Sequence, residues 1–174
     1  TCDAINTAVD KADLILSSGG VSVGEEDYVK KALEEMGRLD LWKIAVRPGK
    51  PLAFGKVKGV PFIGVPGNPV SLFVTFSIFA RPFILRSMGI TDETPVEYRV
   101  VAGFDWNRPD KRIEYMRARL ETNDEGQKVV NVYPSRSSGI LSSVTWADGM
   151  VVLEPGQQIA KGDNVRFIPF TSLY

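Results

Sequence analysis

The sequence of 174 residues contains no histidine and only one cysteine, Cys2. The absence of histidine excludes a Ser-His-Asp triad, a Cys-His dyad and any zinc site with histidine ligands. A single cysteine excludes an internal disulfide and a cysteine metal cluster, and it fits a reducing, cytoplasmic setting. Any catalysis must therefore use carboxylates, lysines, arginines, hydroxyl groups or backbone amides.

The chain also lacks an excess of either charge, because it has 21 basic and 21 acidic residues. No global positive field is available to hold nucleic acid or an anionic membrane surface, so neither is expected as a partner. The composition is 44% hydrophobic and 24% charged, which is typical of a folded globular protein. Any positive patch would have to be local.

The first half of the chain alternates short apolar runs with helical patterns. The predicted elements are helices over residues 4–12, 26–36 and 69–81 and strands over residues 14–16, 41–46, 52–57 and 60–65. Gly37 is well placed to cap the C-terminus of the second helix, and Asn68 and Pro69 are well placed to begin the third. The expected arrangement is a three-layer α/β/α domain.

The third helix is apolar nearly all round, with Phe73, Phe76 and Phe79 among its residues. Such a helix is buried, so these phenylalanines are expected in the core or in a homodimer contact. Arg81 and Pro82 are expected to stop or kink the helix, which leaves the apolar stretch too short to span a membrane.

After about residue 95 the pattern changes to alternation with period two. It predicts strands over residues 97–104, 112–121, 128–134, 150–154 and 165–170. Turn residues at 123–126 and 161–164 separate some of them. Short strands at this spacing are typical of a small barrel or sandwich. We therefore expect an α/β domain over residues 1–92 and an all-β barrel domain over residues 93–174.

The first of three informative loops runs from Ser17 to Asp27, after a strand and before a helix. Hydroxyl groups and backbone amides in such a loop suit phosphate oxygens. The candidate residues are Ser18, Gly19, Gly20, Ser22 and Gly24. Glu26 and Asp27 could hold a divalent cation through oxygen ligands. A plain Gly-rich turn with acidic residues at a helix N-terminus would give the same pattern.

The second loop contains Lys43, Arg47 and Lys50. Lys43 and Arg47 share one face of an extended strand because their spacing is even, and Lys50 follows a Pro-Gly turn. Three cations near one strand end suit phosphate or another oxyanion. A solvated basic strand edge is the plainer interpretation.

The third loop consists of Pro66, Gly67, Asn68 and Pro69. Two prolines around Gly-Asn make a rigid turn that could fix backbone amides around a ligand. A well-capped helix start would have the same residues. All three loops follow predicted strands, and open α/β sheets bind ligands at the C-terminal ends of their strands.

The three loops together resemble the MoeA family, which includes the E domain of gephyrin. The matching strings are SSGGVSVGEEDY (17–28), WKIAVRPGKP (42–51) and GVPGNPVS (64–71). Ser-Gly-Gly alone also fits the molybdopterin adenylyltransferases and the competence-damage-inducible family, whereas the three strings in this order are specific. The resemblance covers essentially the whole chain.

The resemblance implies a molybdopterin molybdenumtransferase. Such an enzyme inserts molybdate into adenylylated molybdopterin and releases AMP, and it requires Mg²⁺ or another divalent cation. It further implies that Asp27 is an acidic residue of the active site. Lys43, Arg47 and Lys50 match basic positions near molybdate and the pterin phosphate.

Further positions follow from the resemblance alone. Pro66 and Pro69 match the family's rigid PGNP loop, and Arg117 and Ser138 of the β domain match residues that face the same cleft. Members of the family are longer than this chain, so the resemblance implies that strands of the α/β domain and further acidic site residues are missing here. The apolar third helix is the reason to expect a homodimer, and the molybdopterin adenylyltransferase is a candidate partner.

Two other functions stay open. One is a molybdopterin adenylyltransferase that acts one step earlier, which would consume ATP with free molybdopterin. The other is a non-enzymatic molybdopterin-binding or scaffold module, which would release no AMP from adenylylated molybdopterin.

Overall fold

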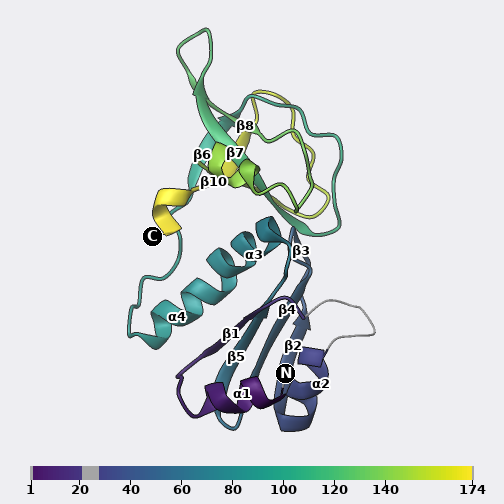
Figure 1. Cartoon of the computed structure of the whole chain (residues 1–174). Coiled ribbons are helices and arrows are strands. Elements are labelled where there is room, and N and C mark those ends of the chain that lie inside the picture. The colour runs from purple at the N-terminus through teal and green to yellow at the C-terminus, as the bar shows by residue number, and fades with distance from the viewer. Residues whose placement is uncertain (1, 21–27, 174) are drawn as a thin grey trace. The chain divides into compact units, whose positions relative to one another are not determined.

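The computed structural model describes residues 2–20 and 28–173 (Figure 1). Contacts between Cα atoms divide the chain into two compact units. The first unit contains Thr1–Ile44 and Gly49–Arg81, and the second contains Ala45–Pro48 and Pro82–Tyr174. The chain therefore passes between the units at three points.

The first unit has helices around a four-stranded sheet. Its elements are α1 (Cys2–Val9), β1 (Ile15–Ser18), α2 (Tyr28–Met36), β2 (Gly37–Lys43), β4 (Pro51–Val57), β5 (Val60–Val65) and α3 (Pro69–Thr75). The strand order is β1-β5-β4-β2. β1 runs parallel to β5, and β4 runs antiparallel to both of its neighbours. The predicted alternation of helices and strands is confirmed within a few residues.

The core of the first unit lies between α1, α2 and one face of the sheet. Its buried residues are Ile5, Ile15, Ala32, Leu33, Ala53, Val57 and Phe62. Ile63 and Val65 alternate with Phe62 along β5 and are buried on the other face, and α3 contacts β5. Both faces of β5 are thus covered, which explains its continuous run of apolar residues.

Gly37 does not cap α2, so that prediction is wrong. It is the first residue of β2 and pairs with Val57 of β4. A β-carbon on Gly37 would lie 2.0 Å from the carbonyl oxygen of Lys56, which no side chain could tolerate. Glycine is required here because two strands approach closely rather than because a helix ends.

Arg81 and Pro82 do not stop the third helix, so that half of the prediction that they stop or kink it is wrong. α3 continues through a π-helical turn, η1 (Phe76–Ala80), into α4 (Arg81–Ser87). In the π turn the amide of Arg81 bonds to the carbonyl oxygen of Phe76, five residues earlier. Pro82 lacks an amide hydrogen and crowds the preceding turn, and the wider π turn accommodates both effects.

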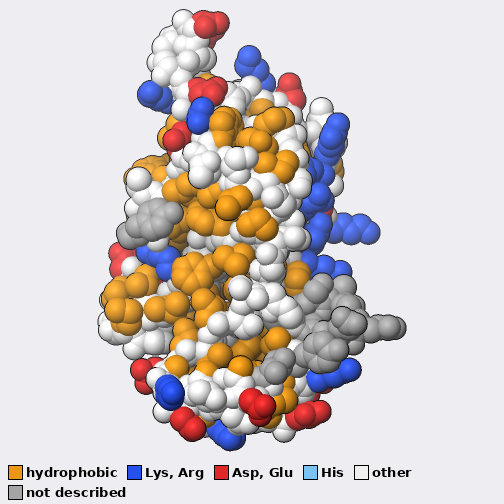
Figure 2. All heavy atoms as spheres, in the orientation of Figure 1, with side chains coloured by type: hydrophobic (Ala, Val, Ile, Leu, Met, Phe, Trp, Pro, Cys, Tyr) orange, Lys and Arg blue, Asp and Glu red, His pale blue; other side chains and the backbone are white. Residues whose placement is uncertain are grey.

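Small residues, not phenylalanines, form the buried face of this long helix. Val70, Ser71, Val74, Thr75, Ser77 and Ala80 are buried. Phe73, Phe76 and Phe79 are only half-buried, so the expectation of burial in the core is wrong. Hydrophobic side chains are visible at the surface of the molecule in this region (Figure 2).

The helix Pro69–Ser87 has 19 residues and a window of mean hydropathy 1.4, with 33% of that window buried. By length and composition it could cross a membrane, contrary to the prediction that it is too short. One such helix is weak evidence for a membrane protein, because core helices of soluble proteins meet the same criteria.

The second unit is a closed barrel of five strands. Its elements are β3 (Val46–Arg47), β6 (Tyr98–Ala102), β7 (Ile113–Thr122), β8 (Lys128–Val132), α5 (Ser142–Trp146), β9 (Gly149–Leu153), β10 (Asn164–Pro169) and a 3-10 turn, η2 (Phe170–Leu173). The order β7-β8-β6-β10-β9 closes through a β7–β9 pairing, and β3 adds to β7 in parallel. The predicted barrel with almost no helix is confirmed.

Candidate functional site

The start of the first predicted loop, residues 17–20, lies beside the third predicted loop in the first unit. β1 and β5 are parallel neighbours, and Ser18 pairs with Val65 at their C-terminal ends. The amide of Gly19 donates a hydrogen bond to the carbonyl oxygen of Val65 at 2.9 Å. A β-carbon on Gly67 would lie 3.5 Å from the Cα atom of Gly19. The backbones of the two loops therefore meet at one end of the sheet.

Glycine is needed in the first loop for its backbone conformation. Gly19 and Gly20 have φ angles of 80° and 68°, in the left-handed region. A β-carbon on Gly20 would also lie 2.5 Å from Cγ2 of Val29. The turn after β1 thus exposes backbone that any other residue would distort.

We expect Gly20→Ala to lower the free energy of unfolding by about 1–2 kcal/mol, the cost of a left-handed residue with a β-carbon. The close approach to Val29 adds to this cost. Gly67→Ala is the matched control, because its β-carbon meets only an ordinary contact 3.5 Å from Gly19. Urea unfolding of both variants measures the difference. Equal losses would contradict this account of the loop.

The basic loop, defined as residues 43–50, ends at the same side of the sheet. Lys43 pairs with Pro51, and Ala53 two residues further along β4 pairs with Gly64 of β5. Lys43 and Lys50 are exposed. Neither forms an ion pair with any residue that the structure describes. Two ammonium groups that form no ion pair within the described part of the chain therefore lie at the sheet end that carries the glycine turns.

The Pro66–Pro69 turn leads from β5 into α3. Pro66 is buried, whereas Gly67 and Asn68 are exposed. Asn68 occupies the N-cap position as predicted, but its side chain makes no capping hydrogen bond. No capping bond occupies its side-chain amide group, which lies next to the first-turn amides of the helix that have no acceptor within the helix.

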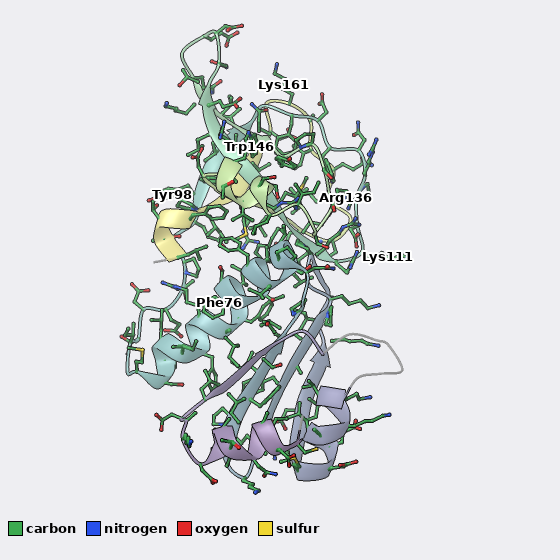
Figure 3. The ribbon with its side chains drawn as sticks, in the orientation of Figure 1. Phe76, Tyr98, Lys111, Arg136, Trp146 and Lys161 are labelled. Carbon is green, nitrogen blue, oxygen red and sulfur yellow. The ribbon has the colours of Figure 1, made fainter. Side chains whose placement is uncertain are left out.

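Arg47 has a different environment from the two lysines. It belongs to the second unit, where its Nη1 atom donates to Oδ2 of Asp110 at 2.8 Å and its Nε atom lies 3.7 Å from Oε1 of Glu114. Arg136, which is labelled in Figure 3, also donates a hydrogen bond to Glu114, and its guanidinium lies 5.0 Å from the centre of the Trp106 ring. The guanidinium of Arg47 is thus already paired with carboxylates.

Asp110 is the centre of this cluster. Arg112 donates to both of its oxygens, from Nε at 2.9 Å and Nη2 at 3.0 Å. The hydrogen bond from Arg112 is the main cause that holds the pKa of Asp110 well below its ordinary value, and the bond from Arg47 adds to it. Asp110 therefore stays ionised throughout the neutral range.

Arg117 is buried inside the second unit, at 4% exposure. It donates to Oγ of Ser143 at 2.9 Å and to the carbonyl oxygens of Ser135 and Ser137 at 2.8 and 3.1 Å. Burial lowers the pKa of Arg117. Ser138, the other predicted residue of the β domain, is half-buried and directly follows one of these carbonyls.

A small cavity in the second unit adjoins Arg47, Arg117 and Arg136. Its volume is about 10 Å³, which is the size of one water molecule. The structure thus brings Arg47 and Arg117 to one small cavity of the second unit. It separately brings Ser18, Gly19, Lys43, Lys50 and the Pro66–Pro69 turn to one end of the sheet.

Sequence reasoning missed Asp110, Arg112, Glu114 and Arg136. Residues 110, 112 and 114 are charged at alternate positions where the chain enters β7 (Ile113–Thr122), and this spacing was an available signal. Charged residues on a strand usually face solvent, and their partner Arg47 is 63 residues away from Asp110. Nothing local in the sequence distinguishes this cluster from an ordinary exposed face.

Family models match both units. Residues 2–86 match the model described as a probable molybdopterin binding domain, and residues 99–170 match the MoeA C-terminal region, domain IV. The chain belongs to the MoeA family. The closed barrel of this MoeA chain corresponds to the second model, and the sheet with its glycine loops corresponds to the first.

Relatives of this MoeA chain carry consistent names. It is 36% identical over 172 residues to the molybdopterin molybdenumtransferase of Haemophilus influenzae, covering 98% of the chain and 43% of the relative. It is 37% identical over 166 residues to molybdopterin molybdenumtransferase 2 of Mycobacterium tuberculosis, covering 91% and 40%. The chain thus spans about two fifths of the length of these relatives.

A solved structure of a MoeA protein has the same fold. The molybdopterin biosynthesis MoeA protein from Pyrococcus horikoshii superimposes with a TM-score of 0.76 at 27% identity, covering 97% of this chain and 40% of that one. The resemblance inferred from three short strings is confirmed by this fold and by the family models.

The predicted cation ligands Glu26 and Asp27 lie outside the described residues, as do Ser22 and Gly24. Within residues 2–20 and 28–173, no group of three or more acidic or cysteine side chains is placed to hold a metal ion. The described part of this MoeA chain therefore offers amides, hydroxyls and cations for anions.

Proposed function

We propose that the chain is part of a molybdopterin molybdenumtransferase, which inserts molybdate into adenylylated molybdopterin and releases AMP. One observation carries the proposal. Four features lie at one end of a four-stranded sheet: the glycine turn at residues 18–20, the Pro66–Pro69 turn, Lys43 and Lys50. The names of the relatives support the same activity for the whole protein.

The chemistry of this sheet end suits oxyanions. Molybdate and a pterin phosphate both carry oxygen atoms with negative charge. Backbone amides of Gly-rich turns and helix starts donate to such oxygens, and ammonium groups add charge-assisted hydrogen bonds. Because Lys43 and Lys50 form no ion pair with any described residue, their charges are available to these ligands.

The resemblance to the family implies a divalent cation, and we propose Mg²⁺ held by Asp27 with help from Glu26. Carboxylate oxygens are the ligands that Mg²⁺ prefers, and such a cation would offset repulsion between phosphate groups. We further propose a cytoplasmic homodimer that receives its substrate from the molybdopterin adenylyltransferase. The proposed anion site depends on neither the cation, the homodimer nor the partner enzyme.

We expect Lys50→Ala in the full-length enzyme to weaken molybdate binding by about 1.5–3 kcal/mol, as for a lost hydrogen bond to a charged group. Lys56→Ala is the matched control, because Lys56 is equally exposed but lies toward the other end of β4, paired with Arg38 and Pro61. Isothermal titration with molybdate measures both. Equal affinity of the two variants would place the oxyanion site elsewhere.

Turnover assays separate this function from its alternatives. The full-length enzyme should release AMP from adenylylated molybdopterin when molybdate and Mg²⁺ are present, and Asp27→Asn should reduce this release while the protein stays folded. ATP consumption with free molybdopterin would instead identify an adenylyltransferase. Binding of molybdopterin with neither reaction would identify a scaffold module.

A further inference from the structure

The middle of the basic loop belongs to a different unit from its ends. Residues 45–48 are part of the second unit, whereas the chain up to Ile44 and from Gly49 is part of the first. The amide of Ile44 donates to the carbonyl oxygen of Lys50 at 3.0 Å and closes the base of the loop. The barrel therefore holds the tip of a loop whose two ends carry Lys43 and Lys50.

The backbone contribution to this anchor is small. β3 has only two residues, and they pair with Ile113 and Glu114 of β7. One further hydrogen bond joins the amide of Ile113 to the carbonyl oxygen of Ala45 at 3.0 Å. Strands in globular proteins are usually longer than this, so two paired residues give a weak hold. Side chains must supply the rest.

Arg47 supplies the side-chain anchor through Asp110 and Glu114. The two carboxylate side chains are 13% and 5% exposed, so solvent screens their pairs with Arg47 less than it screens a surface pair. Arg112 holds both oxygens of Asp110 and thereby fixes the direction in which the carboxylate faces Arg47. The acceptor for Arg47 is thus oriented by the barrel itself.

We propose that Asp110 is a positioning residue for the oxyanion site. By holding Arg47, it fixes the tip of the basic loop and so the placement of Lys43 and Lys50 in the first unit. Asp110 touches no substrate in this scheme and acts only through Arg47. The effect on turnover rests on the proposed function, because it assumes that the two lysines bind molybdate or the pterin phosphate.

Hydrogen exchange on the full-length protein tests the anchor without any substrate. Asp110→Asn and Arg47→Met should each speed exchange of the amides in residues 44–50 by about tenfold or more, because anchored backbone opens locally when its contacts are removed. Glu97→Gln is the matched control. It breaks a two-bond pair with Arg166 in the same barrel, away from the basic loop. Faster loop exchange in this control would contradict the proposal.

A double-mutant cycle tests the effect on turnover. Asp110→Asn should raise the molybdate concentration for half-maximal AMP release by about tenfold, since small misplacements of binding groups are costly. When Arg47→Met is already present, Asp110→Asn should not raise this molybdate concentration further, because the side chain that Asp110 holds has been removed. Equal effects of Asp110→Asn in both backgrounds would overturn the proposal.

The two experiments fail in different ways. If the wild-type enzyme releases no AMP, the proposed function is wrong, and hydrogen exchange alone decides whether Asp110 anchors the loop. If Asp110→Asn does not fold, Arg47→Met and Arg47→Lys replace it. Arg47→Lys retains one charged contact and should keep most of the protection of the loop amides from exchange. Arg47→Met should lose this protection. If the amides of residues 44–50 in Arg47→Met exchange at the wild-type rate, the proposal that Arg47 anchors the loop is wrong.

Discussion

Phe167→Ala should lower the free energy of unfolding by about 3–5 kcal/mol. Phe167 on β10 is 1% exposed and packs in the barrel core with Met116, Val151 and Val165. The loss combines the transfer free energy of the ring with the cost of a cavity, and strands in a closed barrel can move little to fill that cavity. Urea unfolding followed by circular dichroism measures the change.

Tyr98→Ala is the control for this prediction. Tyr98 pairs with Phe167 across β6 and β10, but its side chain is 55% exposed. Tyr98→Ala should lower the free energy of unfolding by less than about 1 kcal/mol, as is usual for surface positions. Similar losses for the two aromatic residues would mean that the barrel core lies elsewhere.

Arg117→Ala should lower the free energy of unfolding by about 2–4 kcal/mol. The variant loses hydrogen bonds from a charged donor to Ser143, Ser135 and Ser137, each worth about 1.5–3 kcal/mol. Removing a buried charge relieves its desolvation, which offsets part of that loss. We expect the hydrogen bonds to dominate because all three acceptors would be left without their donor.

Arg119→Ala provides the comparison for Arg117. Arg119 donates one hydrogen bond, to the carbonyl oxygen of Trp146, and its guanidinium lies 4.8 Å from that ring. Its loss should cost about 1 kcal/mol. Because Arg117 binds the carbonyls on either side of Arg136, exchange of amides 135–139 should also rise in Arg117→Ala but not in Arg119→Ala. Unchanged exchange in both would show that Arg117 does not hold this segment.

Local patterns predicted most of the elements because strands and helices have different periods. β5 was predicted with its observed bounds, since Val60–Val65 is an apolar run between turn residues. Proline and glycine misled the prediction where tertiary structure decides their role. Arg81 and Pro82 are predicted to stop or kink the helix, and the helix instead continues past them through a π turn. Gly37 is predicted to cap α2, whereas the close approach of the Lys56 carbonyl oxygen is what requires glycine there.

Part of the candidate site could likewise be predicted from the sequence, and part could not. Gly19 and Gly67 could be brought together from the sequence, because loops after neighbouring parallel strands share one end of the sheet. The environment of Arg47 could not be predicted, because its partners Asp110 and Glu114 follow it by more than sixty residues, although all three belong to the second unit. Periodicity describes a residue's own strand and carries no information on a partner more than sixty residues away.

The excursion of residues 45–48 constrains how sequences of this family can be recombined. A single crossover after Arg81 would pair the barrel of one relative with a β3 segment from another. Arg47 would then face a foreign residue at position 110, and Ile113 would meet a foreign backbone partner. A chimera should therefore fold with the barrel of another relative only when residues 45–48 are taken from that same relative. The second unit must be exchanged as two separate chain segments.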